Sequence, residues 1–388
     1  MVKTVSKYFK GDAVIWSVMV MLCIFSMLAV YSATGSLAYK SQGGNTTYYL
    51  FRHSFFLIVG LGITFVTHLI PYRYYAGLAT LFLYISIPLL VLTLILGTNI
   101  NQASRWLTLP GIGQTFQTSD LAKLALIMYI AKYLSKKQDL IKDFNSGFLP
   151  IMIPVIIICS LIIKADFSTA AILFATSLVL LFIGRASLKH IFGFIGIGIV
   201  CVAIFIAIAL NSENTGRIGT WKSRIENYVD GGSEGNYQVE QSKIAIVTGG
   251  FFGKGPGNST QRNFLPQAYS DFIYSIIVEE YGIIFGGLPI IFLYLFLLFR
   301  AGIIVKKSER TFPAFLAVGL TFSLVFQAFV NIGVAVNIFP VTGQTLPMVS
   351  MGGTSVLFTS VAFGIILSVS RSTQKNDFNY ELDEQDIQ

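Results

Sequence analysis

The chain has little charge for its length. Of its 388 residues, 12% are Asp, Glu, Lys or Arg and 54% are hydrophobic, whereas soluble domains carry about 25% charged residues. This composition excludes an ordinary water-soluble domain and predicts a polytopic membrane protein. The net charge of +8 does not indicate nucleic-acid binding, because cationic loops on one side of a bilayer account for it.

Cysteine and histidine are also scarce. Cys23, Cys159 and Cys201 all lie in apolar runs without C-x-x-C spacing, which excludes a disulfide framework and a cysteine-based metal site. The three histidines are scattered and form no ligand set. We expect no cleavable signal peptide, because the first apolar run is too long for a signal sequence and is typical of a retained anchor.

Long hydrophobic runs are abundant. A helix that crosses a bilayer needs about 20 mostly apolar residues. Candidate spans lie at about 13–33, 54–70, 76–97, 119–134, 148–164, 167–184, 190–210, 271–299, 312–336 and 353–370. They predict an all-α polytopic membrane protein with about ten transmembrane helices. The eighth span contains Glu279-Glu280-Tyr281-Gly282 and is expected to tilt, kink or break there.

Lys and Arg concentrate in alternate loops, which predicts a cytoplasmic N-terminus. We expect residues 1–12 to be cytoplasmic, residues 13–370 to form one membrane domain, and residues 371–388 to be a disordered cytoplasmic tail. A large extracytoplasmic loop, residues 211–270, separates the seventh and eighth spans. We expect this loop to be partly ordered over the outer face.

Asp271 is the first candidate for chemistry. It lies where the polar loop meets the eighth apolar run, and an acid at the mouth of a membrane helix is costly without a partner or a cavity. If the helix begins near Asp271, Ser275 and Glu279 follow on one face as a polar stripe. The alternative is that Asp271 only caps the helix.

A second candidate combines Arg105 and Trp106 in an outer loop with Asp120 and Lys123 at the start of the fourth span. The two cations could hold a pyrophosphate, and Trp106 could stack on a sugar. The alternatives are an interfacial tryptophan and an Asp120–Lys123 pair within one helix. The spacing leaves both interpretations open.

The segment 337–355 is the third candidate. It is rich in Pro, Gly and hydroxyl side chains and separates two apolar runs, which predicts a re-entrant loop that forms a cavity wall. Gly352 and Gly353 would let the backbone approach a ligand closely.

Lys164 and Asp166 form the fourth candidate. They lie in a short connection between two apolar runs. Either they pair locally with each other or they belong to a cavity.

Together these stretches resemble the SEDS family of bacterial cell-wall proteins (shape, elongation, division and sporulation), over about residues 10–371. The most specific motifs are Phe339–Ser355, Gly255–Ser259, Leu265–Tyr274, Glu279–Gly282, and Ser104–Trp106 with Gln117–Lys123. The Gly-Pro-Gly-Asn-Ser and Leu-Pro-Gln-Ala-Tyr-Ser-Asp-Phe segments are most similar to the division branch. The elongation branch is second.

The resemblance implies a SEDS-type fold and a peptidoglycan glycosyltransferase. Such an enzyme polymerises lipid II into glycan strands during cell division, by an inverting transfer. The resemblance also implies a bacterial cytoplasmic (inner) membrane location at the division site. The expected partners are a class B penicillin-binding protein and other divisome proteins, and no nucleic acid.

By motif match, Asp271 is the family's essential outer-loop aspartate and the expected general base. The expected substrate-binding residues are Arg105, Trp106, Lys123, Asp120, Ser350, Gly352 and Gly353. The expected supporting residues are Glu279, Glu280, Lys164 and Asp166. Thr118 and Asp120 replace the Pro and Glu usual in the family, which leaves the role of Asp120 less secure. A divalent cation (Mg or Mn) could assist, but the sequence assigns it no ligand.

Two other classes of protein fit part of this pattern. A lipid II flippase or ion-coupled carrier would also have intramembrane acids and a re-entrant loop. A non-catalytic division scaffold is the third interpretation. The sequence has no inverted repeat, and its acids lie toward the outer border, which argues against a carrier.

Overall fold

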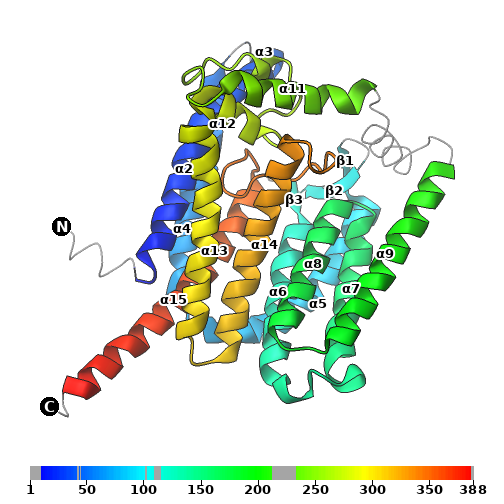
Figure 1. Ribbon diagram of the computed structural model, residues 1–388, viewed down its shortest axis with the longest axis vertical. Coiled ribbons are helices and arrows are strands. Elements are labelled where there is room, and N and C mark those ends of the chain that lie inside the picture. Colours follow the sequence, from blue (N-terminus) through cyan, green and yellow to red (C-terminus); the bar gives the residue numbers. More distant parts are fainter. Residues whose placement is uncertain are drawn as a thin grey trace.

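The computed structural model describes residues 10–41, 43, 45–100, 103–108, 115–211 and 233–385. Its long helices form an upright bundle (Figure 1). The short helix α3, helix α11 and three strands gather at one end, which we call the upper end. The turn between α13 and α14 lies at the opposite, lower end (Figure 1).

The elements follow in chain order. The first half contains α2 Ala13–Ala33, α3 Gly35–Ser41, α4 Thr46–Leu69, α5 Tyr72–Leu96, β1 Thr98–Ile100, β2 Ala103–Thr108, β3 Thr115–Gln117, α6 Thr118–Lys136, the turns η1 Gln138–Leu140 and η2 Phe144–Phe148, α7 Leu149–Ile163 and α8 Phe167–Ile183. The second half contains α9 Leu188–Asn211, α11 Ser233–Gly249, η3 Gln261–Asn263, α12 Ile273–Gly282, η4 Ile283–Gly287, α13 Leu288–Lys307, α14 Thr311–Ala335 and α15 Thr354–Gln385.

Polar caps set several helix starts. Asp12 caps α2 by accepting a hydrogen bond from the amide of Val14 at 2.9 Å, and Asn45 caps α4 in the same way. The Asn45 cap starts α4 well before residue 54. The apolar run missed this first part of the helix because residues 46–53 include Thr, Tyr, Arg and His.

Helix α14 is the centre of the bundle. In its most apolar 18-residue window 72% of the residues are buried, against 22% in α4 and 28% in α5. It packs against α6, α8, α13 and α15. Helices α4 and α5 carry large apolar side chains on the outside, such as Phe55 and Ile95. Their outer faces therefore suit lipid contact.

Seven helices in the described part of the chain are long and apolar enough to cross a membrane, and two shorter apolar helices add to them. Helix α6 coincides with the fourth expected span and carries Asp120, Lys123 and Lys132. The helical multi-pass architecture is confirmed. The count of ten crossings stays a prediction.

Two segments differ from expectation. The connection between α5 and α6 contains a three-stranded antiparallel sheet in the order β1-β2-β3, because its Thr-rich and aromatic segments suit strands. The last helix, α15, continues to Gln385, so the backbone expected to be disordered from residue 371 is helical that far. No Gly or Pro between residues 371 and 385 stops it.

The eighth span is interrupted, as predicted. Helix α12 ends at Gly282, where φ is +73°, and the π-helical turn η4 connects it to α13. The glycine-rich loop before it supplies the cause: the amides of Lys254 and Gly255 donate to the carbonyls of Glu279 and Glu280, both at 2.9 Å. The loop thus provides hydrogen-bond donors to the Glu279 and Glu280 carbonyls at the point where the helix breaks.

Gly282→Ala should destabilise the protein. A Cβ there would lie 2.3 Å from the Phe251 carbonyl oxygen, and the positive φ disfavours any other residue. We expect a loss of about 1–3 kcal/mol, measured as a lower unfolding temperature of the purified protein. The control is Gly302→Ala in α13, where a Cβ meets no atom within 4 Å and should not lower stability. Equal unfolding temperatures for the two variants would contradict the explanation.

Candidate active site

Asp271 lies at the upper end in the turn before α12, and its side chain does not cap that helix. The N-cap of α12 is Phe272, without a side-chain hydrogen bond. Asp271 is half-buried. Its Oδ1 accepts a hydrogen bond from Ser270 Oγ at 2.9 Å, and its carbonyl accepts one from Asn331 Nδ2 at 2.8 Å. The capping alternative is therefore wrong.

Asp271 also does not share a polar stripe with Ser275 and Glu279. Since α12 begins at Ile273, Asp271 precedes the helix and does not follow its periodicity. Ser275 Oγ instead contacts Ser242 Oγ of α11 at 2.5 Å. The expected stripe is wrong because the turn 264–272 carries Asp271 off the helical face.

Glu279 and Glu280 hold the loop 254–262 against α12. The buried Glu279 accepts a hydrogen bond from Lys254 Nζ at 2.6 Å and others from Ser259, Thr260 and Gln261. Glu280 Oε1 accepts from the amide of Ser259 at 3.3 Å and from Ser32 Oγ. Both side chains thus face the loop that leads to Asp271.

Arg105 reaches across the upper end to Asp166. Strand β2 carries Arg105, whose Nη1 lies 3.4 Å from Asp166 Oδ2 and whose Nε donates to the Ala165 carbonyl at 2.9 Å. Asp166 is 3% exposed and caps α8. Lys164 is exposed and forms no ion pair with Asp166. The alternative of a local Lys164–Asp166 pair is therefore wrong.

Trp106 follows Arg105 on the same strand. Neighbouring side chains of a strand point to opposite faces, so Trp106 cannot join Arg105 at Asp166. Its backbone pairs with Gln117 of β3, and its side chain is half-buried. The alternation of side chains along β2 therefore places Arg105, and not Trp106, next to Asp166.

Gly343 lies close to both Arg105 and Asp271. A Cβ at Gly343 would lie 3.6 Å from Arg105 Nη1 and 3.7 Å from Asp271 Oδ2. A guanidinium and a carboxylate therefore flank the same side of this residue. Because glycine has no side chain, the backbone of residue 343 can approach both charged groups closely. The φ of +71° at Gly343 also favours glycine.

Two buried amide side chains connect these groups. Asn331 of α14, 1% exposed, donates from Nδ2 to the carbonyls of Asp271 at 2.8 Å and Gln344 at 2.7 Å. Gln344 Nε2 donates to Asp166 Oδ2 at 3.1 Å and Thr169 Oγ1 at 2.9 Å. One hydrogen-bonded chain thus links the Asp271 turn, the segment 336–353 and the start of α8.

Ser350 connects the same segment to the Asp271 turn. Its Oγ donates to the Ser270 carbonyl at 2.6 Å and accepts from the Leu346 amide at 2.8 Å. Gly352 and Gly353 lie further along, at the start of α15, and are half-buried. The close backbone approach to Arg105 and Asp271 is made by Gly343.

Lys123 and Asp120 of α6 form a second polar cluster, next to the segment 336–353. Lys123 Nζ lies 2.9 Å from Asp120 Oδ1 and donates to Gln327 Oε1 at 3.1 Å. The three line a cavity of about 40 Å³, whereas Arg105 and Asp166 line a separate one of about 10 Å³. The expected Asp120–Lys123 ion pair within one helix is confirmed. The pair is compatible with both substrate binding and a structural role.

The sequence analysis missed Gly343, Gln344, Asn331 and Gln327. A signal for two of them was present: Gln327 and Asn331 are amides at i,i+4 in an apolar run, so they lie on one helix face. Polar side chains in such a helix face the bundle interior. The role of Gly343 depends on three segments meeting and has no signal in the sequence.

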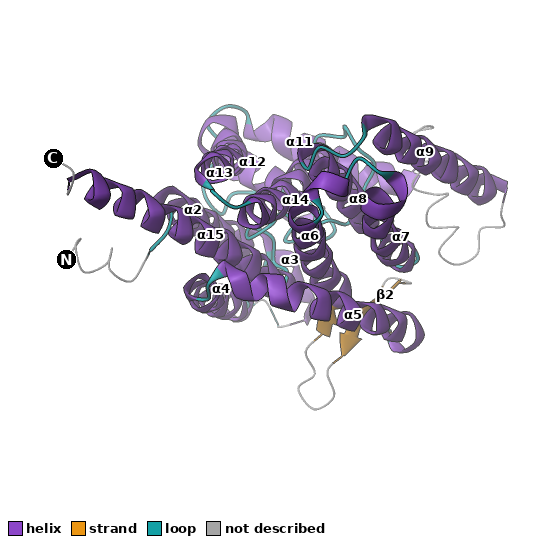
Figure 2. Ribbon diagram, turned by 90° about the horizontal axis from the view of Figure 1, so that it is seen from below, coloured by secondary structure: helices purple, strands orange, loops and turns teal. Residues whose placement is uncertain are grey.

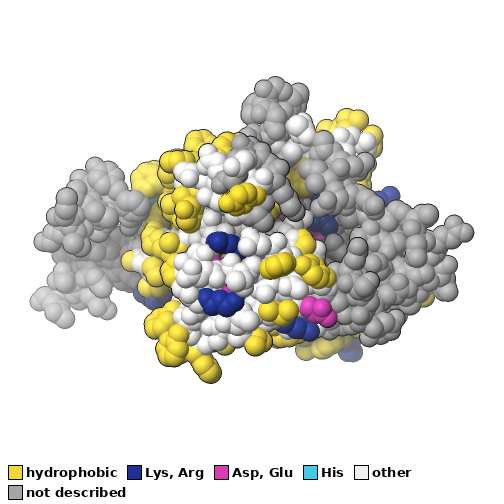
Figure 3. Space-filling view, turned by 90° about the horizontal axis from the view of Figure 1, so that it is seen from above, with side chains coloured by type: hydrophobic (Ala, Val, Ile, Leu, Met, Phe, Trp, Pro, Cys, Tyr) yellow, Lys and Arg dark blue, Asp and Glu magenta, His cyan; other side chains and the backbone are white. Residues whose placement is uncertain are grey.

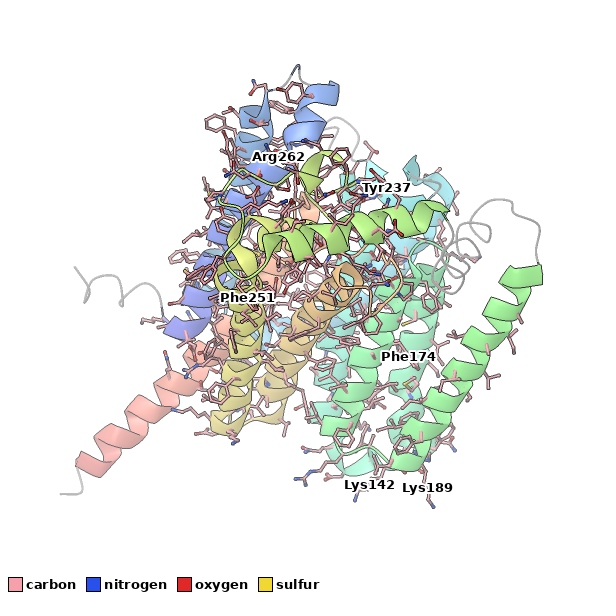
Figure 4. All side chains as sticks on the ribbon, turned by 45° about the horizontal axis from the view of Figure 1, so that its top comes forward. Lys142, Phe174, Lys189, Tyr237, Phe251 and Arg262 are labelled. Carbon is pink, nitrogen blue, oxygen red and sulfur yellow. The ribbon has the colours of Figure 1, made fainter. Side chains whose placement is uncertain are left out.

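The turn also contains Tyr269, whose ionisation responds to Asp271. Burial, and next the charge of Asp271, raise the pKa of the neighbouring Tyr269, so that phenol stays protonated at neutral pH. Seen from above, basic side chains lie beside acidic ones in the middle of this face (Figure 3). Helix α11 with Tyr237, and the loop with Arg262, also lie at this end (Figure 4).

Within the described ranges, no three His, Cys, Asp or Glu side chains are grouped so as to hold a metal ion.

The fold and the site together define a multi-pass membrane protein in which a carboxylate and a guanidinium both approach the irregular segment 336–353. A sequence model of the cell cycle protein family of FtsW, RodA and SpoVE matches residues 12–375. The chain belongs to this family.

Relatives and solved structures agree with this assignment. The chain is 37% identical to the probable peptidoglycan glycosyltransferase FtsW of Trichlorobacter lovleyi, covering 92% of this chain and 93% of the relative. The same-named protein of Nitrosococcus halophilus is 35% identical, covering 89% and 88%. A peptidoglycan synthase complex that coordinates polymerization and crosslinking contains a similar chain, with a TM-score of 0.70, 26% identity and coverage of 94% and 98%. A mutant RodA of Thermus thermophilus has a TM-score of 0.67, 25% identity and the same coverage.

Asn331→Leu should loosen the Asp271 turn. The change removes the two hydrogen bonds that Asn331 donates to the carbonyls of Asp271 and Gln344. Each buried carbonyl left without this bond should lower the stability by about 1–3 kcal/mol. Amide hydrogen exchange in residues 264–272 and 339–350 should become faster.

The matched control is Thr321→Val on the same helix. Thr321 Oγ1 is buried and has no hydrogen-bond partner, so its loss should be neutral or stabilising. Unchanged exchange in Asn331→Leu would show that Asn331 does not hold the two segments together.

Proposed function

We propose that this chain joins lipid II units into glycan strands, with Asp271 as the general base. The chain is a peptidoglycan glycosyltransferase, as its family and the names of its relatives indicate. The observation that carries the assignment of Asp271 is that its carboxylate and the Arg105 guanidinium both approach the same side of Gly343. A base for one reactant and a cation for the other are the two groups that this transfer needs.

The reaction couples one bond formed to one bond broken. The acceptor sugar's 4-hydroxyl attacks the anomeric carbon of the donor, and its proton passes to the Asp271 carboxylate. The bond from the anomeric carbon to the pyrophosphate oxygen breaks, and the electron pair leaves with the pyrophosphate. Arg105 stabilises the negative charge of the leaving group. An inverting displacement of this kind needs no second carboxylate as a nucleophile.

Asp166 and Gln344 act as positioning residues. Asp166 lies 3.4 Å from Arg105 Nη1 and fixes where the guanidinium points, while Gln344 orients the Asp166 carboxylate. A guanidinium that is already oriented loses less entropy when it binds a phosphate.

The proposed setting is the bacterial inner membrane at the division site, with both termini cytoplasmic and the Asp271 site outside. The charge bias of the loops supports this orientation. A class B penicillin-binding protein is the proposed partner, because a structurally similar chain belongs to a complex that coordinates polymerization and crosslinking.

Asp271→Asn should abolish polymer formation. The amide cannot accept the proton, so the rate of lipid II polymerisation should fall by about 10²–10⁴-fold in an assay with purified protein, its partner and lipid II in detergent. Asp139→Asn, an exposed carboxylate far from the site, is the control. Wild-type yield from Asp271→Asn would refute the assignment. Detergent contains no bilayer to cross, so polymer formation by the wild type also separates an enzyme from a flippase or scaffold.

Arg105→Gln should lower the polymerisation rate by about 10²-fold, because it removes a cation from the leaving group. Arg105→Lys keeps the charge but loses the fork geometry, so it should recover part of the rate. The control is Arg52→Gln, which removes an exposed cation at the same end of the bundle. Equal rates for Arg105→Gln and Arg52→Gln would show that Arg105 plays no part in leaving-group stabilisation.

A further inference from the structure

A large cavity lies at the lower end, away from Asp271. Its volume is about 870 Å³, within the size range of small-molecule sites. Its walls come from the start of α2, the turn between α4 and α5, the turn between α13 and α14, and the last buried turns of α15. Figure 2 views the molecule from this end.

The cavity is strongly basic. Lys10, Arg73, Arg310 and Arg371 line it together with the single carboxylate Glu309, a surplus of three positive charges. Arg371 Nη2 donates to the Leu69 carbonyl at 2.9 Å. Arg73 and Arg310 are exposed, and no ion pair within the described part of the chain involves either of them. Uncompensated cations that converge on one cavity suit an anion.

Hydrogen bonds between distant segments tie the walls together. Gln374 of α15 exchanges two hydrogen bonds with the backbone of Gly11, both at 3.2 Å. Ser368 Oγ donates to the Ile70 carbonyl. The α15 wall is therefore bonded both to the N-terminal segment and to the turn between α4 and α5.

The surroundings indicate a lipid as the source of the anion. The wall at Pro71–Arg73 joins α4 and α5, the two least buried spans. Leu69 and Tyr74 beside it are 45% and 65% exposed, and tyrosine favours the membrane interface. A headgroup could enter the cavity while its acyl chains lie along the apolar outer faces of α4 and α5.

We infer that this cavity binds the phosphate headgroup of an anionic phospholipid. Basic pockets between membrane helices recognise such headgroups, and arginine binds phosphate oxygens in a bidentate manner. The site lies at the end opposite Asp271 and takes no part in the glycosyl transfer. Its occupancy is a binding property that can be measured without turnover.

Binding of dioctanoyl phosphatidylglycerol to the purified full chain tests the site, by native mass spectrometry in detergent. The expected result is tighter binding than that of dioctanoyl phosphatidylcholine, with a loss of at least about tenfold in affinity in the double variant Arg73→Gln/Arg310→Gln. Glu309→Gln should instead raise the affinity, because it removes the one opposing charge.

The control for charge alone is Lys142→Gln/Lys189→Gln. It removes two exposed cations at the lower end, away from the lining residues (Figure 4), and should leave the affinity unchanged. Equal losses in the two double variants, or equal binding of the two lipids, would overturn the site. If glycerol 1-phosphate competes as well as the lipid does, the ligand is a soluble phosphate and the lipid assignment fails. Thermal unfolding of each variant confirms that it is folded.

Discussion

The upper end of the bundle depends on one buried amide. Asn331 projects from α14, the most buried span, and its Nδ2 bonds to the carbonyls of both Asp271 and Gln344. Neither segment that supplies these carbonyls is regular structure, so each needs partners for its backbone groups at a buried position. A single side chain on a rigid helix thus sets the distance between the proposed base and the segment that faces it.

The same arrangement explains why Arg105 lies where it does. A short sheet brings it over the start of α8, where Asp166 both caps that helix and pairs with the guanidinium. Gly343, which has no side chain, lies close to both Arg105 and Asp271. The proposed site is therefore built by five separate segments, and the backbone of each is held by hydrogen bonds before any substrate arrives. Such preorganisation lowers the cost of orienting charge in the transition state.

The loop 254–262, which precedes Asp271, is held by a different set of contacts. Glycines at 253 and 282 let the loop and the end of α12 touch backbone to backbone, and Glu279 and Glu280 bond to the polar groups of the loop. Acids inside a membrane helix are costly alone; the loop offsets this cost by donating hydrogen bonds to both carboxylate oxygens of Glu279 and to Oε1 of Glu280, whereas Oε2 of Glu280 has no partner among the described residues. The contacts between this loop and the end of α12 thus explain both why the two acids occur in the span and why the helix breaks after them.

The sequence by itself determined the membrane class, most helix positions and the break after Glu280. The length of the apolar runs, the charge bias of the loops and the position of glycine are local patterns in the sequence, and they predict these features. It also marked Arg105 and the segment 337–355, but not what they contact. Only the tertiary structure decided that Asp166 pairs with Arg105 and not with Lys164, that Asp271 precedes its helix, and that Gly343 lies close to both Arg105 and Asp271. These outcomes depend on how helices far apart in the chain pack, and no local pattern records that packing.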